Sequence, residues 1–181
     1  WARAIAFRNN GVTVVMVSLD SIGIFHDSFI NVRKMINPSL GIDHVMFSSL
    51  HDHEAPDTMG IWSYSIFPSR FDWKYMALVE KACKEAVEEA VRNLQPADTI
   101  LAQVTAGPDG YVDDSRSPIV YDNVIRCARF VKQGTDDTLA TVERCLPLSR
   151  SLEIHTRSAN LGHWRSLNDA CLNLAASHDW I

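Results

Sequence analysis

The sequence has no long hydrophobic run and no concentration of basic charge. Among its 181 residues, no apolar run approaches the ~20 residues that a helix needs to cross a bilayer, so we expect no transmembrane segment. The opening residues WARAIAFRNN lack the basic-then-apolar order of a signal peptide. Seventeen Lys and Arg against 22 Asp and Glu give a net charge of -5. Binding to nucleic acids or to anionic membranes requires clustered basic residues, and the basic residues of this chain are scattered. We therefore expect neither a nucleic acid nor an anionic membrane as a partner.

Paired cysteines, internal repeats and low-complexity segments are also lacking. The four cysteines form no CxxC pair, so they indicate no zinc ribbon and leave the redox compartment open. We expect buried free thiols. What is present is an ordinary globular composition, with 46% hydrophobic and 22% charged residues. This composition and length predict one globular core.

Apolar patterning predicts a β-hairpin at the start of the chain and a short helix after it. The runs 4–7 and 12–19 are largely apolar, and the Asn10-Gly11 pair between them suits a tight hairpin turn. Apolar residues at helical spacing predict a helix over 27–36, with Asp27 or Ser28 as its cap.

The run HVMFSS, residues 44–49, predicts a buried strand. The polar loop that follows would then lie at the carboxyl end of this strand, where α/β sheets usually bind ligands.

The clearest helix is predicted over 72–94, because one apolar stripe recurs at helical spacing. The stripe consists of Tyr75, Val79, Ala82, Cys83, Ala86, Val87, Ala90, Val91 and Leu94. The opposite, charged face consists of Lys81, Lys84, Glu85, Glu88 and Glu89.

Further strands are predicted over 99–104, 124–131 and 139–142, the last two as a hairpin around Gln133-Gly134. Strands that alternate with helices predict an α/β fold, with a mixed sheet flanked by helices.

The loop SSLHDHEAPDTMG, residues 48–60, is the strongest candidate site. On an extended segment His51 and His53 would project to the same face, so that one ring binds a metal while the other meets a substrate or a bridging water. Glu54 and Asp57 are candidates for orienting the rings as carboxylate acceptors. The alternative is a solvated polar loop, since an HxH pair alone is a weak signal.

Asp20 follows the second predicted strand and either orients a metal ligand or caps the next turn.

Aromatic residues after the histidine loop either line an apolar pocket for an acyl chain or belong to the core, and the core is the commoner place for them. These aromatic residues are Trp62, Tyr64, Phe67 and Trp73.

The order of segments over residues 1 to about 141 carries a family resemblance. An ARA strand, VVMVSLDSIGI, GIDHVMFSSLHDHEAPDTMGIW, a long helix and DDSRSP follow one another. This order resembles the N-terminal domain of the neutral/alkaline non-lysosomal ceramidase family. The S-x-T-H-x-H-x-x-P loop of that family corresponds to 48–56, with Leu50 where threonine is usual, and its N-R-S-P element corresponds to 115–118. We therefore predict a partial ceramidase-like domain over 1–142, incomplete at both ends relative to the family domain.

Members of that family are zinc-dependent amidohydrolases that cleave ceramide to sphingosine and a fatty acid. The resemblance implies that His51 is a zinc ligand, that His53 lies beside the metal near the scissile amide, and that Arg116 is an active-site cation. It also implies a bound Zn²⁺, an amphiphilic ceramide-like substrate, and a secreted, periplasmic or membrane-surface location. From the residues alone, Arg116 has a plainer alternative in an ion pair with Asp113 or Asp114.

The resemblance ends near residue 142, and the tail over 143–181 shows none of it. The second histidine ligand of the family lies in a His-Pro pair, where this chain has Leu146-Pro147. The glutamate and tyrosine that complete the family's zinc site are expected further along than residue 181. The tail is either a shifted reading frame or a genuine tail with substitute ligands. Those substitutes would be His155, His163 or His178.

Two functional classes follow from these observations. The first is a zinc-dependent amidohydrolase of the ceramidase type. The second is a non-catalytic fragment, or an inactive family member, that keeps the fold but not a full zinc site. Bound zinc together with hydrolysis of an N-acyl lipid would distinguish the first class from the second.

Overall fold

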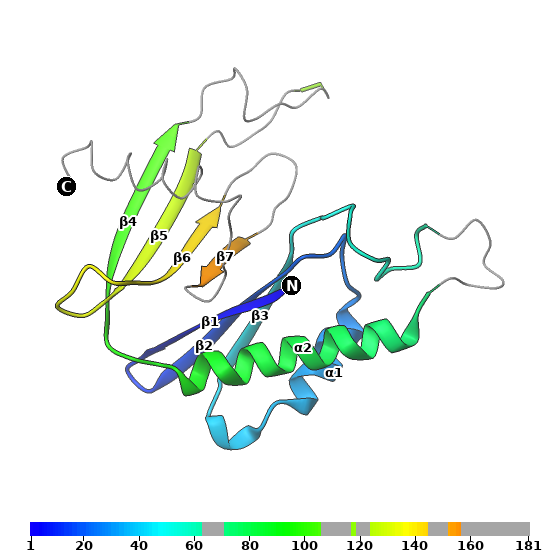
Figure 1. Ribbon diagram of the computed structural model, residues 1–181, viewed down its shortest axis with the longest axis horizontal. Helices are drawn as coiled ribbons and strands as arrows, with labels where there is room; N and C mark the ends of the chain where they lie inside the picture. The colour runs from blue at the N-terminus through cyan, green and yellow to red at the C-terminus, as the bar shows by residue number, and fades with distance from the viewer. Residues whose placement is uncertain (63–70, 106–116, 119–123, 145–151, 157–181) are drawn as a thin grey trace. The chain divides into compact units, whose positions relative to one another are not determined.

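The computed structural model places the chain in the α/β class, as the sequence predicts (Figure 1). It describes residues 1–62, 71–105, 117–118, 124–144 and 152–156. The chain divides into two compact units, residues 1–95 and 96–181. This division was not predicted from the sequence, which indicated one globular core. The ceramidase-like segment over 1–142 stays a prediction.

A three-stranded mixed sheet forms the centre of the first unit, in the order β1-β2-β3. Strands β1 (Ala2–Asn9) and β2 (Val12–Leu19) are antiparallel, whereas β3 (His44–Ser49) runs parallel to β2. The turn between β1 and β2 has φ values of 49° at Asn10 and 81° at Gly11. Both values lie in the left-handed region that Asn and Gly tolerate best, so the predicted Asn-Gly hairpin is confirmed.

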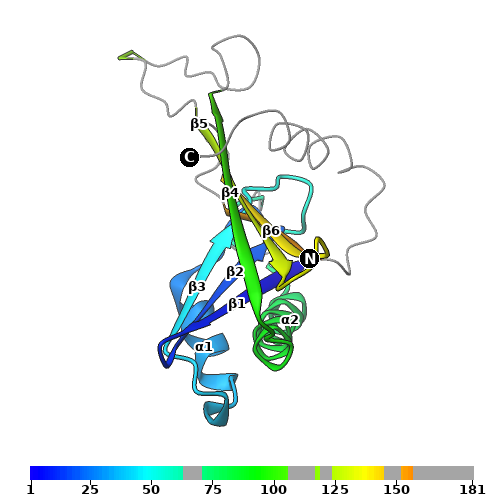
Figure 2. The same ribbon diagram turned by 90° about the vertical axis from the view of Figure 1, so that its left-hand side faces the viewer.

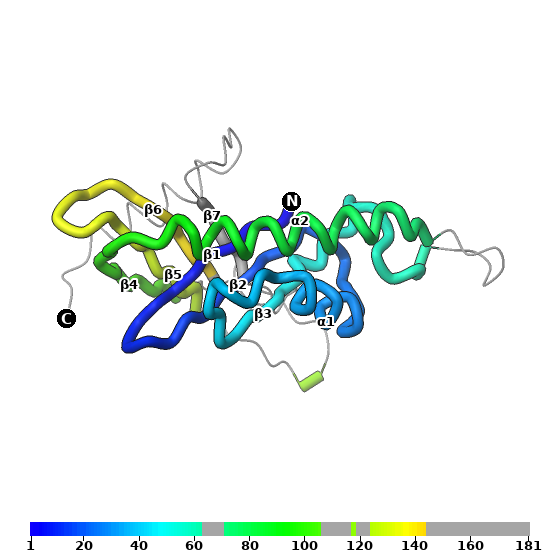
Figure 3. The backbone as a smooth tube through the Cα atoms, turned by 90° about the horizontal axis from the view of Figure 1, so that it is seen from below, coloured from blue at the N-terminus to red at the C-terminus, as the bar shows by residue number. Residues whose placement is uncertain are grey.

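Two helices cover one face of this sheet (Figure 2). Helix α1 (His26–Met35) is followed by a short 3₁₀ helix, η1 (Pro38–Leu40), and α2 (Trp73–Arg92) lies beside α1 (Figure 3). The core between sheet and helices consists of Val15, Val17, Leu19, Val32, Val79, Cys83, Val87 and Val91. Full burial of a side chain such as valine contributes about 1.5–3 kcal/mol.

The two helix starts differ in how they are capped. The Asp72 carboxylate accepts hydrogen bonds from the backbone N–H groups of Lys74 and Tyr75, at 2.8 and 3.2 Å, and so caps α2. The predicted cap of α1 was wrong, because Phe25 occupies that position and makes no side-chain cap bond. Asp27 lies instead within the first turn of α1, where its negative charge interacts favourably with the positive end of the helix dipole.

The prediction that Glu88 belongs to the exposed, charged face of α2 was wrong, because its side chain is only 4% exposed. One carboxylate oxygen accepts the Asn37 backbone N–H at 3.0 Å, while the other contacts Lys84 at 3.0 Å and Arg92 at 2.7 Å. The Asn37 hydrogen bond and the two cations lower the pKa of Glu88 to about 2, although burial opposes ionisation. This carboxylate joins α2 to the segment that follows α1.

Strand β3 was predicted at the correct residues but is not a buried strand. None of its residues is fully buried, and Met46 is 55% exposed. Alternate side chains of the strand face opposite sides of the sheet, so Val45 and Phe47 pack against the core while Met46 lies on the other face. Among the described strands only β2 pairs with β3.

The second unit contains a four-stranded antiparallel sheet in the order β4-β5-β6-β7. Its strands are β4 (Ala97–Thr105), β5 (Val124–Lys132), β6 (Thr138–Arg144) and β7 (Leu152–Thr156). The predicted hairpin is confirmed as β5 and β6. Strand β7 was missed, because the sequence over 143–181 shows no clear alternation.

The turn that joins β5 to β6 is held by Arg129. Its Nε donates to the Thr138 hydroxyl at 2.8 Å, and its Nη2 donates to the Asp136 carboxylate at 3.0 Å.

In the part of the chain that the structure describes, no helix is long and apolar enough to span a membrane.

Candidate functional site

Two loops meet at the carboxyl ends of β2 and β3. Since these strands are parallel, the segments that leave them, residues 20–25 and 50–62, start at the same edge of the sheet. Backbone hydrogen bonds continue the pairing into the loops, from Leu50 N–H to the Leu19 carbonyl and from Asp52 N–H to the Ser21 carbonyl, both at 3.0 Å. The histidine loop is therefore anchored to the turn after β2.

His51 is fixed by a hydrogen bond to a backbone carbonyl. Its Nδ1 lies 2.9 Å from the Ile22 carbonyl oxygen. A carbonyl can only accept, so Nδ1 carries the proton, and in the neutral ring Nε2 carries the lone pair. The metal-ligating histidines of proteins usually show this arrangement, with one ring nitrogen on the metal and the other donating to a fixed acceptor.

The two histidine rings lie together, but not for the reason predicted. His51 has a φ of 62°, so the segment turns at this residue and is not extended. The ring centroids of His51 and His53 are 4.9 Å apart with an interplanar angle of 81°. The His53 ring also lies 5.6 Å from the Trp62 ring. A turn of the backbone therefore brings the two rings together, and both side chains are exposed.

Asp57 organises the backbone of its own loop. One carboxylate oxygen accepts the N–H groups of Met59 at 2.9 Å and Gly60 at 2.7 Å, and the other accepts the Trp62 N–H at 2.9 Å. Partial burial opposes ionisation, but these hydrogen bonds outweigh it and hold the pKa of Asp57 below its ordinary value.

The described contacts of the other two candidate carboxylates, Asp20 and Glu54, involve neither histidine ring. The Asp20 carboxylate pairs with Arg3 at 2.6 Å and with the amino group of Trp1 at 3.5 Å, so its described partners are neither a metal ligand nor the following turn. Glu54 is exposed, and its backbone N–H donates to the Asp52 carboxylate at 2.9 Å. The acceptor that orients His51 is the carbonyl of Ile22, which sequence reasoning missed because every residue has a carbonyl.

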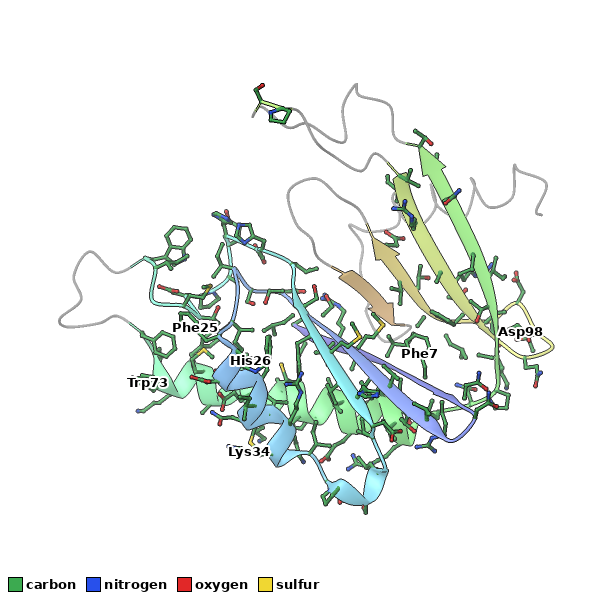
Figure 4. All side chains as sticks on the ribbon, turned by 180° about the vertical axis from the view of Figure 1, so that it is seen from behind. Phe7, Phe25, His26, Lys34, Trp73 and Asp98 are labelled. Atoms are coloured by element: carbon green, nitrogen blue, oxygen red, sulfur yellow. The ribbon has the colours of Figure 1, made fainter. Side chains whose placement is uncertain are left out.

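The aromatic residues after the loop divide into two groups. Tyr64 and Phe67 lie outside the described residues. The interpretation of Trp62 and Trp73 as core residues was wrong, because Trp62 is 47% and Trp73 is 77% exposed. Figure 4 shows Trp73 and the exposed Phe25 at the end of the first unit where the two helices start.

Several predicted site residues lie outside what the structure describes. Arg116 and the Leu146-Pro147 pair are among them, as are His163 and His178, and of His155 only the backbone in β7 is described. Within the described residues, no group of three or more His, Cys, Asp or Glu is placed so that it could hold a metal ion. His51 and His53 fit zinc by ligand chemistry, and any further ligands would come from other parts of the protein.

No family model, curated protein or solved structure matches this chain. The fold defines the chain as an α/β protein, and the two loops after β2 and β3 carry the candidate site residues. Fold alone does not specify function, whereas the geometry of particular side chains restricts the chemistry available.

Proposed function

We propose that this chain carries part of the active site of a zinc-dependent amidohydrolase of the ceramidase type. Such an enzyme hydrolyses the N-acyl amide bond of ceramide-like lipids to a sphingoid base and a fatty acid. The hydrogen bond from His51 Nδ1 to the Ile22 carbonyl is the observation that supports this proposal most directly. It leaves Nε2 as the nitrogen with a lone pair, as a zinc ligand requires.

Each residue has a role in this proposal. His51 would hold the zinc, and the neighbouring His53, with its ring centroid 4.9 Å away, would take or donate a proton at the scissile amide. Arg116, which lies outside the described residues, would hold an anionic or hydroxyl group of the substrate. Bound zinc would supply Lewis-acid polarisation of the amide carbonyl and would lower the pKa of a bound water toward ~7.

An amphiphilic substrate also agrees with a secreted, periplasmic or membrane-surface location, which is part of the proposal. The alternative is a non-catalytic fragment or inactive family member. It is favoured by Leu146-Pro147, which stands where the resemblance expects the His-Pro ligand pair. Leucine has no metal-binding atom, so the two possibilities differ in whether the chain binds zinc.

Zinc content tests the proposal. The purified chain and its His51→Ala variant are dialysed against metal-free buffer, and their zinc is measured by elemental analysis. His44→Ala is the matched control, because His44 is an exposed histidine at the start of β3, the strand whose other end leads into the histidine loop. We expect roughly one zinc per chain in the wild type and in the control, and loss of zinc in His51→Ala.

Hydrolysis is measured in parallel with a ceramide that carries a fluorescent acyl chain. Release of the labelled fatty acid by the wild type and the control, but not by His51→Ala, would support the amidohydrolase. Absence of zinc from the wild type, or zinc retained by His51→Ala, would overturn the role of His51. Zinc without hydrolysis would favour the inactive family member.

A further inference from the structure

Two consecutive carbonyl groups in the turn after β2 accept hydrogen bonds from side chains of the histidine loop. The Ile22 carbonyl accepts from His51 Nδ1 at 2.9 Å. The next carbonyl, that of Gly23, accepts from the Thr58 hydroxyl. Thr58 is fully buried, and Ile22 is 5% exposed. The turn is thus held from one side by His51 and from the interior by Thr58.

The close approach of the loop to Gly23 keeps these contacts together. A Cβ atom added at Gly23 would lie 2.5 Å from the sulfur of Met59, which is closer than such atoms approach each other. Met59 follows Thr58 directly, so the side chains of two successive loop residues contact the same glycine. Asp57, which precedes Thr58, accepts the Met59 and Gly60 backbone N–H groups. The backbone is therefore restrained on both sides of Thr58.

We propose that Thr58 is a positioning residue for His51. By holding the Gly23 carbonyl, the Thr58 hydroxyl fixes the adjacent peptide group, whose Ile22 carbonyl accepts the proton of His51 Nδ1. This arrangement determines the tautomer of His51, with the proton on Nδ1 and the lone pair on Nε2. The consequence for zinc rests on the proposed function, whereas the tautomer itself can be measured without metal.

The simpler role for Thr58 is purely structural. A buried hydroxyl requires a hydrogen-bond partner, and the Gly23 carbonyl satisfies this need whatever His51 does. The two roles differ in one measurable respect. If Thr58 only satisfies its own hydroxyl, removing the hydroxyl lowers stability and leaves the tautomer of His51 unchanged. If Thr58 positions the turn, removing it also releases the acceptor of Nδ1, and the ring then populates both tautomers.

The tautomer is measured by long-range NMR correlation of the imidazole nitrogens with the carbon-bound ring protons of ¹⁵N-labelled protein. The sample is held in metal-free buffer, at a pH at which the imidazoles are neutral. The chain has seven histidines, and the His51 signal is identified by its loss in His51→Ala. We expect the Nδ1–H tautomer in the wild type, a mixture of tautomers in Thr58→Val, and the wild-type tautomer in Thr58→Ser, which keeps the hydroxyl.

An unchanged tautomer in a folded Thr58→Val variant would overturn the proposal, and so would a wild-type protein with the proton on Nε2. If Thr58→Val does not fold, the tautomer of His51 is measured in Thr58→Ala, which also removes the hydroxyl, and the same two outcomes apply. Rapid exchange of the Thr58 hydroxyl proton with solvent in the wild type would contradict its hydrogen bond to the Gly23 carbonyl and would also overturn the proposal.

Zinc affinity provides the second readout, which depends on the proposed function. Loss of a group that orients a metal ligand typically lowers affinity by about 10–100-fold. We expect a decrease of that order in Thr58→Val and recovery in Thr58→Ser, measured by competition with a chromogenic chelator. If the wild type binds no zinc, the proposed function fails, while the tautomer measurement still decides whether Thr58 positions His51.

Discussion

Replacing Glu88 by glutamine removes a buried negative charge that three donors share. The Asn37 backbone N–H and the side chains of Lys84 and Arg92 all bind this carboxylate. The ordinary pKa of 4.5 falls to about 2 in the folded chain. This difference corresponds to about 3 kcal/mol, since one pKa unit is worth about 1.4 kcal/mol. Arg92 is 57% exposed, so solvent screens its contribution, and we expect about 2 kcal/mol at pH 7.

The pH dependence gives this prediction its sign. Because the folded-state pKa is lowered, the stabilisation is fully present above pH 4.5 and is lost as the pH falls from there toward about 2. Urea unfolding followed by circular dichroism at 222 nm measures the free energy of unfolding. We expect Glu88→Gln to be less stable than the wild type at pH 7, and the difference to shrink steadily below pH 4.5.

Glu85→Gln is the matched control on the same helix. Glu85 pairs with Lys81 at 3.7 Å, but their side chains are 60% and 68% exposed. An exposed pair at this spacing contributes only about 0.3–0.5 kcal/mol. A Glu88→Gln difference that persists unchanged at pH 2.5, or that is no larger than the control at pH 7, would refute the reasoning.

Two further predictions concern the first unit. Gly11→Ala should lower the free energy of unfolding by about 1 kcal/mol, because φ at Gly11 is 81° and alanine tolerates this conformation poorly. An added Cβ meets no atom within 4 Å, so the cost is one of backbone conformation alone. A variant as stable as the wild type in urea unfolding would contradict the left-handed turn. Cys83 is fully buried, and burial is the main cause that raises its pKa to about 11. It should therefore resist iodoacetamide at pH 8 in the folded chain and react after unfolding, as measured by peptide mass mapping; rapid labelling of the native protein would contradict its place in the core.

Local patterns in the sequence were sufficient to predict most elements of the first unit. The Asn10-Gly11 pair marks a turn that few other residues tolerate, and the apolar stripe over 72–94 has the helical period. Both signals lie within a few residues of the structure that they specify, so they can be recognised without knowing the tertiary fold. The HxH spacing predicted that His51 and His53 project to one face of an extended segment, whereas their rings come together through the turn at His51.

The features that were missed depend on segments distant in sequence. Glu88 has the spacing of an exposed helix residue, and only the approach of the segment after α1 brings the Asn37 N–H to its carboxylate. Strand β3 has the composition of a buried strand, but Met46 lies on the face of the sheet opposite the helices and is exposed, whereas Val45 and Phe47 pack against the core. The division between residues 95 and 96 likewise depends on which segments pack together.

By itself, the sequence determined the α/β class, the hairpin, the long helix and the position of the histidine loop after β3. Only the tertiary structure decided how His51 is held, because its partner is a backbone carbonyl that lies 29 residues away along the chain. Side-chain types are read directly from a sequence, and so are periods of two or 3.6 residues. The partner of a ring nitrogen depends instead on how the parallel strands β2 and β3 bring their two loops together.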